Sequence, residues 1–171
     1  MQNAIANRIL YPQTIPVTLE EMQIDLSIMR EALKKNKSFI SKSDRKIFIP
    51  DSFLYRIPDL AKLVWVFIDA YILDQEISEN APVWTVVLRG GKDEIVGSVI
   101  LPKMLSGDIM EVTLEGKKIV AKKGGLTLIP CTENKCKMQF KLKLGSVLGK
   151  REGIVEVSGG RLGLLIDGRE L

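Results

Sequence analysis

Glycine is confined to one part of this chain. All fourteen glycines of the 171 residues lie between Gly90 and Gly168. Because glycine marks turns and bulges, this distribution predicts a change of architecture near the middle of the sequence. We therefore predict a mainly helical region over residues 1–81 and an all-β domain over residues 82–171.

The formal charge divides at the same place. Residues 1–82 carry ten Lys/Arg and eleven Asp/Glu, which gives −1, and residues 83–171 carry fifteen and ten, which gives +5. Hydrophobic residues make up 46% and charged residues 27% of the chain. This balance is typical of a globular protein that can bury a core and excludes a disordered chain.

The first region predicts two main helices and one short strand. Thr18 and Glu21 have the spacing of a capping box, and apolar residues follow at helical intervals up to a stop near Asn36. After a polar loop over residues 38–44, Lys46–Ile49 predicts a strand that Pro50 ends. Asp59 is the predicted N-cap of a second helix, which extends to about Leu73. Its apolar run over 63–68 indicates burial on nearly all faces, although a strand there stays open as an alternative.

The second region shows the alternation and turn spacing of β-strands. Glu115-Gly116 is a two-residue hairpin signal, and a polar turn over residues 132–135 separates two further strands. The fold class predicted is α+β, with a small helical N-terminal part packed on or beside a sandwich or barrel of about seven strands. The predicted strand segments are Val83–Leu88, Ile95–Leu101, Ile109–Leu114, Lys117–Ala121, Leu126–Cys131, Cys136–Leu144, Gly153–Val157 and Leu162–Ile166.

Histidine is absent, and the only cysteines are Cys131 and Cys136. The side chain most used for acid–base catalysis near neutral pH is therefore missing. Zinc usually takes four nitrogen or sulfur ligands, and no histidine or further cysteine exists to complete such a site. For the cysteines, two thiols in a reduced compartment are favoured over a disulfide across the turn.

Three glycine pairs and a series of lysines are the other candidate features. Gly90-Gly91, Gly124-Gly125 and Gly159-Gly160 lead into β pattern instead of a helix, so turns are favoured over phosphate-binding loops. A nucleic-acid surface would interleave aromatic residues with its cations, which this part of the sequence does not do. Nucleic-acid binding stays as an alternative function. The lysines concerned are Lys117, Lys118, Lys122, Lys123, Lys137, Lys141 and Lys143.

Carboxylates near the end of the chain, and two on the second helix, could form a catalytic pair. We favour surface salt bridges for them, with Arg161 and Arg169 as ready partners. An enzyme that uses carboxylates or lysine in a cleft stays as a third possibility. The carboxylates considered are Asp167, Glu170, Glu156, Asp69 and Asp74.

The start of the chain shows no secretory signal pattern, and the apolar run over 63–68 is too short to span a bilayer. We therefore expect a soluble, cytoplasmic protein that does not bind membranes.

The order of motifs in the second region resembles the C-terminal end of the glutamate-mutase accessory proteins. That family is built on an actin-like ATPase body and is associated with cobalamin-dependent mutases. The string Gly159–Arg169 is the most specific part of the resemblance, and weaker similarity extends over most of the chain. The segments that carry it are Gly125–Pro130, Lys141–Gly149, Val155–Arg169, Asn7–Thr14, Glu20–Leu33 and Leu63–Ala70.

This chain departs from that family where the family binds nucleotide. The N-terminal ATPase body is missing, and the late glycine-rich loop would correspond to Ile49–Pro58, which contains no glycine. We therefore predict no ATP binding, no cofactor, and no catalytic, cofactor-binding or metal residues. The resemblance implies a non-enzymatic accessory or scaffold protein. Its partner would be an ATPase body, a mutase-like enzyme or another copy of itself.

Overall fold

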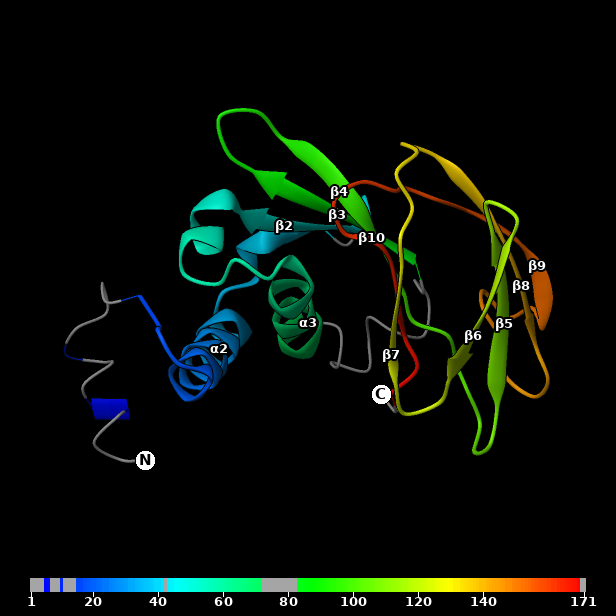
Figure 1. Cartoon of the computed structure of the whole chain (residues 1–171), viewed down its shortest axis with the longest axis horizontal. Helices are drawn as coiled ribbons and strands as arrows, with labels where there is room; N and C mark the ends of the chain where they lie inside the picture. Colours follow the sequence, from blue (N-terminus) through cyan, green and yellow to red (C-terminus); the bar gives the residue numbers. More distant parts are fainter. Residues whose placement is uncertain (1–4, 7–9, 11–14, 42, 72–82, 170–171) are drawn as a thin grey trace.

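The computed structural model describes residues 5–6, 10, 15–41, 43–71 and 83–169. In this part of the chain two α-helices and two β-sheets form three layers, so the protein belongs to the α+β class, as predicted. Figure 1 shows the helices on one side, the larger sheet in the middle and the smaller sheet on the other side. The predicted features at Leu73, Asp74 and Glu170, and along Asn7–Thr14, lie wholly or largely outside the described residues.

Helix α2 (Leu19–Lys35) begins where its capping box predicts. The Thr18 hydroxyl accepts a hydrogen bond from the Glu21 amide, and the Glu21 carboxylate accepts one from the Thr18 amide. Helix α3 (Leu60–Tyr71) begins after Asp59, whose carboxylate accepts a hydrogen bond from the Lys62 amide. Both predicted helices are therefore confirmed over their described residues.

The two helices pack on each other and are tied at their C-terminal ends. Tyr71 of α3 donates a hydrogen bond from its hydroxyl to the carbonyl of Asn36, the C-cap of α2. Burial raises the pKa of Tyr71 to about 12, so the hydroxyl keeps its proton at all physiological pH values. Asp25 of α2 also forms an ion pair with Arg56, at 3.1 Å.

The six-stranded sheet has the order β1-β2-β3-β4-β10-β7. Strands β2 and β3 are parallel, as are β4 and β10, and the other neighbours are antiparallel. This sheet contains strands from both sides of residue 82. Its strands are β1 (Ile40–Ser41), β2 (Lys46–Pro50), β3 (Val83–Arg89), β4 (Glu94–Ile100), β7 (Leu126–Ile129) and β10 (Gly163–Asp167).

The four-stranded sheet has the order β6-β5-β8-β9 and is antiparallel throughout. Residues 83–169 thus hold eight strands, one in each of the eight predicted segments, against a predicted total of about seven. The predicted loop over 38–44 instead contains a 3-10 turn, Lys37–Phe39, and strand β1, which pairs with β2. The strands of the second sheet are β5 (Ile109–Leu114), β6 (Lys117–Lys122), β8 (Cys136–Leu142) and β9 (Glu152–Val157).

Two hydrophobic cores lie on opposite faces of the six-stranded sheet. The helices cover one face, where Trp84 and Leu165 are buried with residues of α3. The four-stranded sheet covers the other face, where Leu164 and Ile166 are buried. Strand β10 therefore serves both cores, and all five of its residues are buried.

Candidate functional site

The three glycine pairs lie in the connections between strands, not at helix N-termini, as the sequence predicts. Gly159-Gly160 has a particular structural role. The Gly159 amide donates to the carbonyl of Glu133 at 3.0 Å, and the Gly160 amide donates to the carbonyl of Cys131 at 2.8 Å. A Cβ on Gly159 would lie 2.7 Å from the Cys131 sulfur, so only glycine lets the chain pass so close. The most specific string of the sequence therefore packs against the cysteine turn.

Cys131 and Cys136 form a disulfide across the turn that joins β7 to β8. The prediction of two free thiols is therefore wrong for this structure. The disulfide across the turn was the alternative that the sequence left open, and the polar turn over residues 132–135 brings the two side chains together. Cys131 is 1% exposed and Cys136 is 4% exposed.

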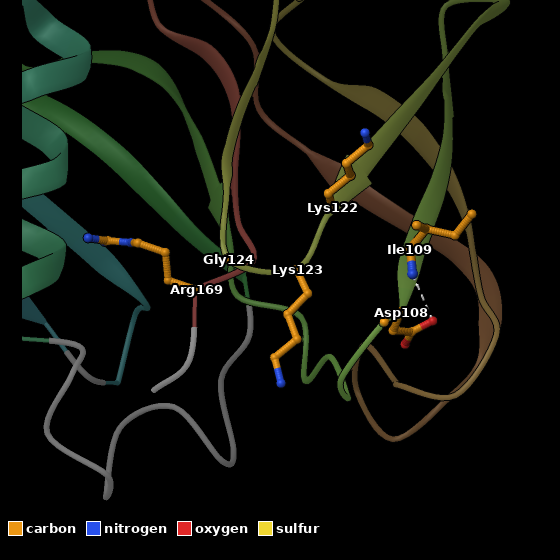
Figure 2. Close-up of a pocket in the computed structure, with 7 residues that line it drawn as sticks. Asp108, Ile109, Lys122, Lys123, Gly124 and Arg169 are labelled. Atoms are coloured by element: carbon orange, nitrogen blue, oxygen red, sulfur yellow. Dashed lines mark hydrogen bonds between the residues drawn. The ribbon is translucent and has the colours of Figure 1, made fainter.

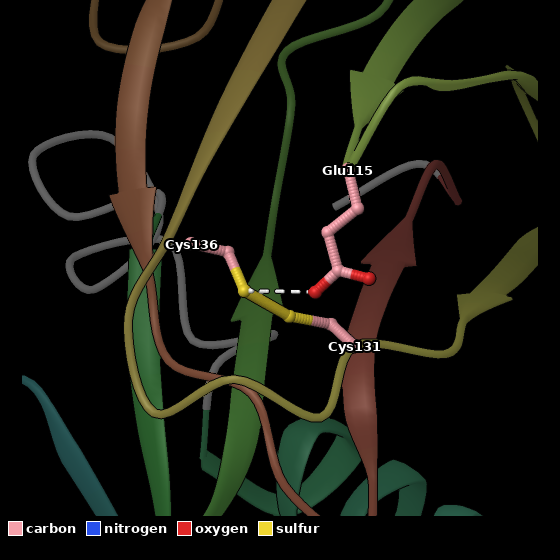
Figure 3. Close-up of side chains that lie close together, drawn as sticks. All are labelled: Glu115, Cys131 and Cys136. Atoms are coloured by element: carbon pink, nitrogen blue, oxygen red, sulfur yellow. Dashed lines mark hydrogen bonds between the residues drawn. A yellow bond between two sulfur atoms is a disulfide. The ribbon is translucent and has the colours of Figure 1, made fainter.

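Glu115 lies beside this disulfide (Figure 3). Its carboxylate Oε1 is 3.4 Å from the Cys136 sulfur, and one ligand atom from each of Glu115, Cys131 and Cys136 lies within 4.8 Å of the others. Glu115 reaches this position from the β5–β6 hairpin turn. There Glu115 and Gly116 both have positive φ, 49° and 77°, as the predicted two-residue hairpin requires.

An open depression of about 510 Å³ lies between the two sheets, lined in part by Lys122, Lys123 and Arg169. Figure 2 shows that these three side chains point in different directions, and Arg169 points toward the helices. The cations do not converge on one point. The depression therefore lacks the arrangement that would hold a single anionic group.

Asp108, at the edge of this depression, is a buried anchor. Its carboxylate accepts hydrogen bonds from four backbone amides, those of Ile109, Lys143, Leu144 and Gly145, at 2.6–3.3 Å. Burial by itself would raise the pKa of Asp108, but the four donors outweigh it and hold the pKa below its usual 3.8. The residues that follow β8 are thereby tied to the start of β5.

The carboxylates near the end of the chain are paired with cations. Arg169 contacts Asp167 at 2.6 Å and Asp69 of α3 at 2.8 Å, and Lys135 contacts Glu156 at 3.2 Å. The predicted pairing with Arg169 is therefore confirmed for Asp167 and Asp69, whereas Glu156 pairs with Lys135. The Arg169 pairs are not on the surface as predicted, since the Asp167 side chain is fully buried. Burial alone would lower the pKa of Arg169, yet the bonds to both carboxylates raise it further above its ordinary value.

The lysines of β8 face solvent, as their alternation predicts, but they lie opposite carboxylates. Lys141 is in register with Glu111 of β5 on one side and Glu152 of β9 on the other, and Lys137 is in register with Glu156. These neighbours offset the positive charge of this face. They weaken the argument for a nucleic-acid surface, which the sequence alone could not assess because it does not reveal strand pairing.

Several apolar side chains at and near helix α2 are exposed to solvent. Val17 and Leu19, at the start of α2, are 89% and 72% exposed. Ile24 and Ile28 of α2 line a shallow hollow of about 250 Å³ together with Ile5 and the polar residues Glu20, Gln23 and Ser27. We call the five apolar residues the α2 surface. Sequence reasoning missed this surface, because a helical apolar pattern does not reveal which residues another layer will cover.

Among the described residues, no helix is long and apolar enough to cross a membrane. Comparison with known proteins adds no relative: no family, no curated protein and no solved structure matches this chain.

Proposed function

We propose that this protein is a non-enzymatic accessory or scaffold protein that acts through protein–protein interaction. It would be related to the C-terminal part of a mutase-associated actin-like protein. The string Gly159–Arg169 supports the relationship. The observation that carries the interaction is the exposed apolar α2 surface, because apolar side chains that cluster in solvent mark binding sites.

The occupant that we propose for the α2 surface is a second copy of this chain. The same surface offers both exposed apolar side chains, Val17 and Leu19, and a hollow whose apolar part is formed by Ile5, Ile24 and Ile28. A two-fold symmetric interface requires such a self-complementary patch, because both copies contribute the same residues.

Charge complementarity supports an antiparallel arrangement of the two α2 helices. The first turn of α2 is acidic, with Glu20 and Glu21, and its last turn is basic, with Lys34 and Lys35. The exposed Ile28 lies near the middle of the helix. Two antiparallel copies would therefore bring the acidic end of one helix to the basic end of the other around an apolar centre.

Charge reversal tests this arrangement in the whole protein. Glu20→Lys and Lys35→Glu are each expected to weaken dimerisation about tenfold, because each places like charges opposite one another. The double variant restores the attraction and is expected to recover most of the affinity. Sedimentation equilibrium over a range of concentrations gives the dissociation constant of each form.

A second pair of variants separates this surface from other exposed apolar residues. Val17→Ser with Leu19→Ser removes apolar area from the α2 surface, so dimerisation is expected to weaken at least about tenfold. Ile154→Ser changes a residue that is 67% exposed on the four-stranded sheet, and is expected to leave dimerisation unchanged. A wild-type protein that stays monomeric at high micromolar concentration would overturn the proposal of a second copy. If Ile154→Ser loses the dimer while the Val17→Ser, Leu19→Ser variant keeps it, the dimer interface lies on the four-stranded sheet and not on the α2 surface.

A further inference from the structure

The group formed by Glu115, Cys131 and Cys136 has no part in the proposed interaction. Its three residues come from separate places in the chain: the β5–β6 turn, the connection that follows β7 and the first residue of β8. Two of the three side chains are buried, and Glu115 is exposed. The fold thus gathers two sulfurs and a carboxylate at one end of the four-stranded sheet (Figure 3).

The surroundings of the sulfurs are rich in oxygen. The Cys136 sulfur is 3.4 Å from the Glu115 carboxylate and 3.6 Å from the carbonyl of Glu133, and the Cys131 sulfur is 3.9 Å from that same carbonyl. A disulfide has no hydrogen atom to donate to these oxygens. Two thiols would have one each, and two thiolates with a carboxylate would surround a cation. The oxygens therefore suit the reduced or metal-bound state of the cysteines better than the disulfide.

Backbone hydrogen bonds from Gly159 and Gly160 hold the backbone around the two sulfurs in place. The carbonyl groups of Cys131 and Glu133 accept the hydrogen bonds from Gly160 and Gly159 described above. These bonds do not involve the sulfur atoms, so reduction of the disulfide leaves them intact. The cysteine turn is therefore fixed to the connection that precedes β10, and the thiols are expected to stay close together after reduction.

From this arrangement we propose that the reduced protein binds one divalent zinc-like metal ion through Cys131, Cys136 and Glu115. Thiolate and carboxylate are both established zinc ligands, and three protein ligands leave the fourth tetrahedral position for water. Sequence spacing predicts no such site, because the third ligand comes from a hairpin turn sixteen residues before Cys131. The disulfide and the metal exclude each other, since the metal needs both sulfurs as thiolates.

Metal binding follows reduction of the disulfide as a separate step. A trialkylphosphine reduces the disulfide, and two protons and one oxygen from water yield two thiols and the phosphine oxide. The metal ion then displaces one proton from each thiol and forms two metal–sulfur bonds. No other oxidant or reductant takes part.

Cobalt(II) is a direct probe of the site, because its thiolate complexes have charge-transfer absorption in the near ultraviolet and its tetrahedral complexes absorb in the visible. We expect the phosphine-reduced whole protein to bind one Co²⁺ per chain with both absorptions, and zinc to displace it. The oxidised protein is expected to show neither. Cys136→Ser is expected to abolish the thiolate absorption, and Glu115→Gln to weaken Co²⁺ binding about tenfold or more.

Glu111→Gln is the matched control, because Glu111 is an exposed carboxylate on strand β5, which leads into the turn of Glu115, and it lies opposite Lys141, away from the cysteines. It is expected to bind Co²⁺ as the wild type does, and circular dichroism verifies that each variant is folded. The proposal is overturned if the reduced protein gives no thiolate absorption, or if Glu115→Gln binds as tightly as the wild type. Equal binding by protein unfolded in urea would also overturn it, because the site would then owe nothing to the fold.

Discussion

Asp108 shows how much one side chain can hold together in this protein. It is 2% exposed and accepts four backbone hydrogen bonds, three of them from residues 35–37 positions later in the chain. We expect Asp108→Asn to lower the free energy of unfolding by about 2 kcal/mol. The asparagine amide carries no charge. Its NH₂ group would face a backbone N–H that also donates, so hydrogen bonds to that side of the group are lost. Urea unfolding measures the loss, with Glu111→Gln as a control that is expected to change little.

The same carboxylate has a predictable effect on acid stability. The pKa of Asp108 is lower in the folded protein than the usual 3.8. The ionised carboxylate therefore contributes fully to the free energy of unfolding above about pH 3.8, and this contribution is lost as the pH falls through the pKa of the folded state. The difference in unfolding free energy between wild type and Asp108→Asn should therefore narrow below about pH 4. A difference that stays constant down to pH 2 would show that the charge of Asp108 is not the cause.

Gly163 provides a second test at the residue scale. Its φ is +76°, and a Cβ there would meet the carbonyl of Ile129 and lie 3.1 Å from the Cys131 nitrogen. Gly163→Ala is therefore expected to cost roughly 2 kcal/mol or more of stability, measured by urea unfolding. Gly91→Ala is the control, because nothing lies within 4 Å of the added carbon. Equal stabilities of the two variants would contradict this explanation.

Single residues were predictable where their partners are close in sequence. The capping box of Thr18 and Glu21 and the hairpin at Glu115-Gly116 each need only a few neighbouring residues, and both are confirmed. Asp108 was not recognised, and for Cys131 and Cys136 free thiols were favoured over the disulfide that the structure contains. The partners of Asp108 lie on another connection, and the state of the cysteines depends on how the turn between them folds.

At the scale of elements, Arg169 links helix α3 to strand β10. It pairs with Asp69 and with the fully buried Asp167, and its guanidinium lies 5.4 Å from the centre of the Trp65 ring. Arg169→Met keeps the apolar stem but leaves Asp167 without its cation, so we expect a loss of about 2–3 kcal/mol in thermal or urea unfolding. The exposed Arg161 is the control, and Arg161→Met is expected to have little effect. A comparable loss in both variants would argue against a specific role of this link.

The cross-strand register of the four-stranded sheet makes a prediction about nucleic acid. Because Lys141 lies between Glu111 and Glu152, we expect no salt-dependent binding of a labelled oligonucleotide in an anisotropy titration. Glu111→Gln with Glu152→Gln exposes the lysine charge and should bind weakly at low salt. Tight binding by the wild type that weakens steeply with salt would restore the nucleic-acid alternative.

Strands were predictable one by one, but their partners were not. Period-two alternation predicts β8 to within two residues of its observed end, because alternation is a local property. The parallel pairing of β2 with β3, and the place of β10 between β4 and β7, bring together segments 30–70 residues apart. Nothing in the local pattern specifies which strands will meet.

At the scale of the whole molecule, the two predicted regions share a sheet and a core. The division at residue 82 stays a prediction about folding units. Since β2 pairs with β3 and both contribute to the core under the helices, we expect a single cooperative unfolding transition. Tryptophan fluorescence, which reports on Trp65 and Trp84, should coincide with far-ultraviolet circular dichroism. Two separated transitions would instead support independent units.

The position of β10 also has a consequence for synthesis on the ribosome. This strand is the middle member between β4 and β7 and contributes to both cores, yet its residues are translated after all the other described strands. Until Gly163–Asp167 leave the exit tunnel, β4 and β7 each lack a neighbour, and neither apolar face is closed. The nascent chain must therefore pass through a period in which strand edges and apolar residues are open to solvent. In that period we expect it to depend on chaperones far more than the finished protein does.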